Sequence, residues 1–220
     1  MSFFFCQIYV KYIVLRDNDI TSAEVLETLS DVIMLDLSYN DIGNLTPLNA
    51  LQNLTDLYLD GNKNITGILD NNVIYLSIKD CAMNGFDISK LKQLRSIDIS
   101  FNSINVIDLL QSKEENLYIS GENVKLTKEQ FEYLLSQRQF YNDRHKYIDF
   151  YSPIITMNVL VPYNLDSIEW LKKYDDIQVD NGIIVDNYLD IVDNTSPITL
   201  SLNSKVGNGL YNPIIILNAS

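Results

Sequence analysis

The sequence has few of the residues that build metal sites and disulfide frameworks. Its 220 residues include two cysteines and one histidine. Two cysteines do not make a disulfide framework, and without a C-x-x-C pair or further histidines they do not make a zinc site. No run of about 18 apolar residues occurs, so we expect no transmembrane helix. The sequence therefore predicts no metal, no cofactor and no membrane insertion.

Positive charge is also scarce. The chain has 16 Lys and Arg residues against 29 Asp and Glu residues, which gives a formal net charge of −13. Nucleic acids and anionic membrane surfaces are both bound through basic patches. The sequence thus argues against a nucleic-acid partner, and its acidity favours a basic one.

Motifs for catalysis are missing too. The sequence has no G-x-S-x-G, no P-loop and no H-E-x-x-H. Asp36, Asp56 and Asp98 form a regular row, but a catalytic carboxylate pair needs two different environments, and calcium needs six to eight oxygen ligands. His145 has no evident chemical partner. We expect no catalytic residues and no enzyme.

What the sequence does contain is a repeated pattern, clearest over residues 35–54. Leu35-Asp-Leu37-Ser-Tyr-Asn40-Asp-Ile42 has the form L-x-L-x-x-N-x-I. Its two leucines point the same way on a strand, because side chains alternate along a strand. Apolar residues then recur every third position up to Leu54, which is typical of 3₁₀ turns. Such a unit is a leucine-rich repeat, and it buries its apolar side only by stacking on neighbours.

Six copies follow one another at a period of about 22 residues. They predict an α/β leucine-rich repeat solenoid over residues 10–125, right-handed, with parallel strands on its concave face. In the fourth copy a cysteine replaces the asparagine, and in the sixth a glutamate does. The residues in the two strand positions, the asparagine position and the following apolar position are Ile13, Leu15, Asn18 and Ile20; Leu35, Leu37, Asn40 and Ile42; Leu57, Leu59, Asn62 and Ile65; Leu76, Ile78, Cys81 and Met83; Ile97, Ile99, Asn102 and Ile104; and Leu117, Ile119, Glu122 and Val124.

The asparagine of each copy has a structural task. A buried amide can donate to and accept from backbone groups that would otherwise lack partners. Stacked copies should therefore form an asparagine ladder, in which Cys81 keeps a weak donor. Because each repeat contacts only its neighbours, we expect Cys6 and Cys81 to lie too far apart for a disulfide.

Two segments have the form of a capping box, which starts a helix. Thr21-Ser-Ala-Glu24 predicts a short helix on the convex side of the first repeat. Thr127-Lys-Glu-Gln130 predicts a helix over about 127–139 that closes the end of the repeats. The apolar residues at helical spacing in this second helix are Phe131, Leu134, Leu135 and Phe140.

The repeat pattern ends near residue 145, so we divide the chain into a repeat domain (1–144) and a β-rich domain (145–220). Asp166-Ser-Ile-Glu169 predicts a capped short helix in the second domain. An immunoglobulin-like sandwich is one candidate for its fold. Turn signals stand at 180–182 and 207–209, and strands rich in β-branched and aromatic residues are expected at 147–150, 154–161, 183–192, 198–202 and 214–217.

Residues 32–62 resemble the repeats of internalin-type bacterial leucine-rich repeat proteins, and the resemblance extends more weakly over 8–125. It implies a curved repeat domain followed by an immunoglobulin-like domain, with a concave face that binds a host protein. It also implies a secreted or cell-surface adhesin, although no wall-anchor signal occurs. Repeats of this length are also found in intracellular eukaryotic scaffolds, so a cytoplasmic regulatory scaffold and a structural spacer stay open as alternatives.

The concave strand positions are where we expect the partner. Every copy offers Tyr or Phe there, and aromatic side chains supply large contact area. Six strands span roughly 25 Å, enough for about 800 Å² of contact. We therefore predict a non-enzymatic, monomeric protein-recognition module; alternatively, the tyrosines form only a solvated cross-strand ladder. The predicted partner-binding residues are Tyr12, Asp36, Tyr39, Asp56, Tyr58, Asp60, Tyr75, Lys79, Asp98, Phe101 and Tyr118.

Overall fold

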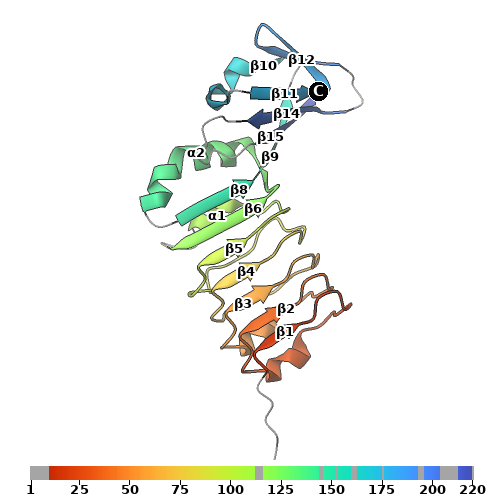
Figure 1. Ribbon diagram of the computed structural model, residues 1–220, viewed down its shortest axis with the longest axis vertical. Coiled ribbons are helices and arrows are strands. Elements are labelled where there is room, and N and C mark those ends of the chain that lie inside the picture. The colour runs from red at the N-terminus through yellow and green to blue at the C-terminus, as the bar shows by residue number, and fades with distance from the viewer. Residues whose placement is uncertain are drawn as a thin grey trace, which may run out of the picture.

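The computed structural model describes residues 10–111, 116–143, 146–151, 153–159, 163–174, 176–192, 196–203 and 213–219. The molecule is elongated (Figure 1), with strands stacked from β1 at one end towards two further sheets at the other. We call residues 10–126 the repeat region.

A parallel sheet runs through the repeat region. Within the described residues it has seven strands in the order β1-β2-β3-β4-β5-β6-β8. Six of them come from the six predicted copies, which confirms the parallel pairing. Their bounds are β1 Tyr12–Val14, β2 Met34–Asp36, β3 Asp56–Tyr58, β4 Tyr75–Ser77, β5 Ser96–Asp98 and β6 Leu117–Glu122.

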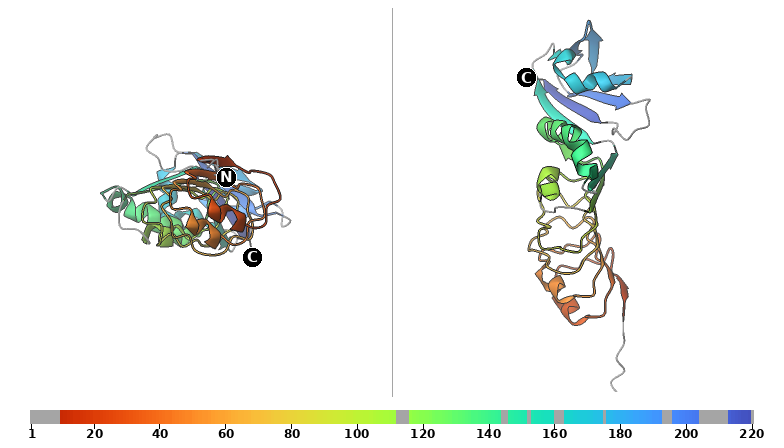
Figure 2. Two further views of the ribbon diagram at one scale, coloured as in Figure 1. Left: turned by 90° about the horizontal axis from the view of Figure 1, so that it is seen from below. Right: turned by 90° about the vertical axis from the view of Figure 1, so that its left-hand side faces the viewer.

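The return segments follow the three-residue spacing of the leucines. Successive hydrogen bonds link the amide of Leu48 to the carbonyl of Leu45, Leu51 to Leu48 and Leu54 to Leu51. These four leucines are fully buried, and η2 (Thr46–Ala50) is a 3₁₀ helix as predicted. Figure 2 shows these segments packed behind the strands.

The short helix predicted from the first capping box is present, but the box itself does not form. η1 (Glu24–Thr28) is a 3₁₀ helix that begins after Ala23. The amide of Glu24 donates to Ser22 Oγ at 3.2 Å. A two-residue serine turn therefore starts the segment, and the Thr21–Glu24 box does not form.

The predicted alignment of the sixth copy is also wrong, by two residues. Ile97 pairs with Ile119 rather than with Leu117. Gly121 consequently fills the second strand position, and Val124, not Glu122, occupies the asparagine position. A side chain at Gly121 would collide with Val124. The glycine at 121 therefore makes room for the apolar Val124 in the asparagine position.

The second capping box is confirmed. The amide of Thr127 donates to Gln130 Oε1 at 3.0 Å, and the amide of Gln130 donates to Thr127 Oγ1 at 3.2 Å. It starts α2 (Lys128–Asp143), which buries Phe131 and Leu134. A shorter helix, α1 (Val106–Gln111), precedes it in the return segment of the fifth copy.

The strand after α2 lies in a different sheet from the one we predicted. β8 (Lys146–Tyr151) covers the candidate at 147–150. It pairs in parallel with β6, with Ile148 beside Ile119. The chain thus adds a seventh strand to the repeat sheet after its L-x-L pattern has ended.

Two smaller sheets complete the described chain. One has the order β11-β14-β15-β9-β7, and the other β10-β13-β12. The predicted strand at 183–192 is a hairpin, because Asp186 and Asn187 both adopt positive φ and turn the chain. The bounds are β7 Lys125–Leu126, β9 Ile154–Val159, β10 Tyr163–Asn164, β11 Asp176–Asp180, β12 Gly182–Val185, β13 Tyr188–Ile191, β14 Ile198–Asn203 and β15 Ile214–Ala219.

The predicted short helix is present as the 3₁₀ helix η4 (Glu169–Lys173), which follows a second 3₁₀ helix, η3 (Leu165–Ser167). Asn164, rather than Asp166, caps η3, because its side chain accepts from the amide of Asp166. Trp170 of η4 packs its ring on Phe131 of α2, 4.9 Å between centroids. This contact joins the C-terminal sheets to α2. The turn signal at 207–209 lies outside the described residues.

Candidate functional site

The outward side of β1–β6 and the turns after these strands form one surface, which we call the strand face. On β2, β3 and β5 the middle residue is buried and its two neighbours are half-buried. All eleven predicted residues lie on these strands or within four residues after them. The most exposed are four aromatics: Tyr12, Tyr39, Phe101 and Tyr118.

Two tyrosines meet at the centre of the strand face. The rings of Tyr58 and Tyr75 lie 5.3 Å apart between centroids. Burial, and then the charges of Asp56 and Asp36, raise the pKa of Tyr58. Burial, and then the charge of Asp98, raise the pKa of Tyr75. Both phenols therefore stay neutral at physiological pH and can donate hydrogen bonds.

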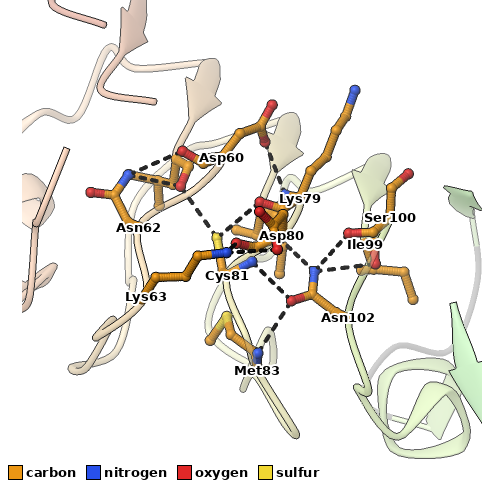
Figure 3. A network of polar contacts seen from close by, with 12 residues as sticks. Asp60, Asn62, Lys63, Lys79, Asp80, Cys81, Met83, Ile99, Ser100 and Asn102 are labelled. Atoms are coloured by element: carbon orange, nitrogen blue, oxygen red, sulfur yellow. Dashed lines mark hydrogen bonds and ion pairs between the residues drawn. The ribbon is translucent and has the colours of Figure 1, made fainter. Parts of the chain in front are cut away.

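Asp60 serves the fold rather than the surface. Asp60 is only 8% exposed. Its Oδ1 accepts from Ser77 Oγ at 2.5 Å and from the amide of Lys79 at 2.9 Å. Figure 3 shows Asp60 beside Lys79 within the polar network of the turns. The alternating sequence pattern did not reveal that Asp60 is buried and accepts two hydrogen bonds.

The basic side chains described on the strand face are engaged with neighbours. Lys79 Nζ lies 3.1 Å from Asp98 Oδ2. Burial alone would lower the pKa of Lys79, but the hydrogen bond and charge of Asp98 outweigh it and the net shift is upward. Arg16 lies 4.3 Å above the centroid of the Tyr39 ring. Asp36 and Asp56, by contrast, form no ion pair within the described residues.

A left-handed residue follows every strand of the six copies, immediately before the asparagine position. Positive φ angles occur there at Asp17 (57°), Tyr39 (55°), Gly61 (74°), Asp80 (48°), Phe101 (58°) and Asn123 (49°). The amides of Tyr39 and Phe101 donate to carbonyls of the next repeat at 2.6 and 2.8 Å. Bulky residues are rare in this conformation. The repeat pattern did not predict these left-handed residues. The one indication of them was Gly61, directly before Asn62.

The asparagine ladder is confirmed. The Asn102 amide nitrogen donates to the carbonyls of Ile78, Ile99 and Ser100. Its oxygen accepts from the amides of Cys81 and Met83. Asn40 and Asn62 make equivalent bonds one repeat apart. Figure 3 shows Asn62, Cys81 and Asn102 on successive turns.

Cys81 takes the asparagine position of the fourth copy as a free thiol. Its Sγ lies 3.3 Å from the carbonyl oxygens of both Leu59 and Lys79. Burial raises the pKa of the thiol to about 12 from an ordinary 9.0. Cys6, the other cysteine, lies outside the described residues.

This pKa predicts a loss of stability in alkali. The unfolded chain releases the thiol proton near pH 9, whereas the folded chain holds it until about pH 12. The free energy of unfolding should therefore fall as pH rises from 9 to 12, by on the order of 1 kcal/mol per pH unit. Urea midpoints between pH 8 and 11 should fall more steeply for the native chain than for Cys81→Ser, whose hydroxyl does not titrate there. Parallel curves would contradict the assignment.

The described residues contain no group of three or more metal-binding side chains. None of the described helices is long and apolar enough to cross a membrane.

No protein-family model and no curated protein matches the sequence. Among solved structures, the chain is similar to the functional domain of InlJ from Listeria monocytogenes, which includes a cysteine ladder. The TM-score is 0.59 at 16% identity, over 96% of this chain and 48% of that one. This chain thus spans about half the length of that structure. InlJ is an internalin with leucine-rich repeats, and the likeness concerns the fold.

Proposed function

We propose that this chain is a non-enzymatic protein-recognition module. In this proposal the repeat region is a right-handed leucine-rich repeat solenoid, and its strand face, the concave side, binds a basic protein. The observation that carries the proposal is the pair of exposed aromatics held at positive φ, Tyr39 and Phe101.

Neither aromatic is buried in the core, although the ring of Tyr39 packs on Gly61 of the next repeat. Tyr39 is 45% exposed and Phe101 43%. A left-handed conformation costs a bulky residue roughly 1–2 kcal/mol. Gly61 stands in the same turn position and avoids that strain. Strained residues that gain little burial are typical of binding sites.

The charge of the strand face sets the class of partner. Asp36 and Asp56 lie beside Tyr58, near the centre of the face, and no described cation pairs with them. A basic partner would supply one and would be steered to the face at low salt. Arg16 stacked on Tyr39 illustrates how a partner's guanidinium would sit on an exposed ring.

The location and state of assembly belong to the same proposal. The internalin-like fold favours a secreted or cell-surface adhesin that works as a monomer. A structural spacer would need no strained aromatics on its surface. An intracellular scaffold would bind its partner in the cell that makes it, so extracts of a host and of the producing cell distinguish these locations.

The test removes the aromatic anchors. We expect the triple variant Tyr39→Ala, Tyr58→Ala, Tyr75→Ala to lose captured partner by at least tenfold, because truncating one anchor costs about 2 kcal/mol. The matched control truncates Val25 and Ile68, which are exposed apolar residues of the return segments. If both variants retain the same partners in pull-downs, the strand face is not the binding site.

A further inference from the structure

The C-terminal hairpin exposes apolar side chains that no described element covers. On β12, Ile183 is 56% exposed, Ile184 38% and Val185 63%. Consecutive residues point to opposite faces of a strand. The face with Ile183 and Val185 is therefore bare, whereas Ile184 points to the other face, beside the fully buried Leu189 of β13, and is only partly exposed. Contiguous exposed apolar surface of this kind marks an interaction site.

β12 is also an edge strand. Within the described residues its sheet has the order β10-β13-β12. Figure 1 places it at the far end of the molecule from β1. Edge strands usually carry charges or proline that block further pairing. The sequence of β12, Gly-Ile-Ile-Val, has neither.

The register shows which backbone groups are available. The amide of Val192 donates to the carbonyl of Asn181 at 3.2 Å, so Asn181 faces β13. In an antiparallel pair the direction of the backbone groups alternates from residue to residue. Ile183 and Val185 therefore also face β13, and Gly182 and Ile184 direct their amides and carbonyls to the open edge.

Charge disfavours a second copy of the chain on this edge. Residues 174–203 contain six aspartates and no Lys, Arg or His. A two-fold antiparallel pairing centred on Ile183 would set Asp180 opposite Asp186 of the second copy. Like charges directly opposite each other destabilise a strand pair. The edge instead suits a strand with an apolar centre and basic ends.

We propose that β12 is a second binding site, which takes an extended basic-ended peptide segment by β-strand addition. Backbone bonds from Gly182 and Ile184 hold the peptide, β-branched side chains of the peptide cover the apolar faces, and its Lys or Arg residues meet Asp180 and Asp186. This site does not depend on the strand face, and the triple tyrosine variant should bind the peptide as the native chain does.

The test uses a synthetic probe, Lys-Lys-Thr-Val-Thr-Val-Thr-Lys-Lys, in titrations with the full chain. Ile184→Pro removes the amide that faces the edge and leaves the β13 side of the strand unchanged. We expect it to weaken binding at least tenfold. Ile184→Thr, which keeps the amide, should bind within threefold of the native chain. Equal binding by Ile184→Pro and the native chain would overturn the proposal, as would no binding by the native chain.

Two further measurements keep the result independent of folding defects. On binding of the probe, the amides of Gly182 and Ile184 should gain protection from hydrogen exchange, while that of Val185 stays unchanged. The same peptide with Glu in place of Lys should bind at least tenfold more weakly. Protection confined to other residues, equal binding of the Glu peptide, or dimerisation of the chain through β12 would each contradict the proposal.

Discussion

Replacing Asn102 with alanine is expected to lower the free energy of unfolding by about 3 kcal/mol. The side chain is 1% exposed and makes five hydrogen bonds to backbone groups. Those groups stay buried in the variant, where neither solvent nor another side chain replaces the amide. The penalty of unsatisfied buried groups adds to the lost bonds.

Asn18 provides the control from the same chain. It occupies the same position in the first copy, but it is exposed, and among the described residues its side chain bonds to the Arg16 carbonyl alone. Asn18→Ala should cost less than about 0.5 kcal/mol. Urea denaturation measures both variants, with Asn40→Ala expected in between. Equal losses of unfolding free energy at positions 18 and 102 would mean that the ladder does not stabilise the fold through burial of its amides.

Replacing Tyr39 and Phe101 together with glycine should abolish most partner binding without loss of stability. Two exposed anchors disappear, which we expect to weaken binding at least 30-fold, or about 2 kcal/mol. Glycine relieves the strain at positive φ but adds entropy to the unfolded chain. The free energy of unfolding should therefore change by less than about 1 kcal/mol.

Asn123→Gly is the matched control, because Asn123 has the same left-handed conformation and no aromatic ring. It should leave partner binding unchanged. Binding is compared by titration with the captured partner, and stability by urea midpoint. A double glycine variant that binds normally would show that the strained aromatics have another role.

The repeated strands and the ladder could be predicted because their spacing encodes them directly. Leu35 and Leu37 point inward, and Asn40 bonds where an amide was required. The same rule failed at the sixth copy. Leu117, Ile119 and Gly121 alternate, so the spacing alone allows two alignments, which the pairing of Ile119 with Ile97 and the contact of Gly121 with Val124 distinguish.

The surface was predicted less completely than the core. Alternation along a strand placed Tyr58 and Tyr75 on the strand face, but it could not distinguish an exposed carboxylate from a buried one such as Asp60. The pairing of β8 depends on long-range contact after α2, which no local pattern reports. The left-handed turns were missed because one glycine among six positions gives little indication of backbone conformation.

The ladder also determines how the repeats melt. Each asparagine bonds to backbone of its own repeat and of the repeat before it, so opening one repeat removes bonds from two. Cys81 makes only weak sulfur contacts to the third repeat, whereas Asn62 and Asn102 each bond to the repeat before them through a full amide. At this junction Asp60 of the third repeat adds hydrogen bonds from Ser77 and from the amide of Lys79 of the fourth. We therefore expect the coupling of the third and fourth repeats during unfolding to depend on a buried carboxylate, where other junctions depend on an asparagine amide.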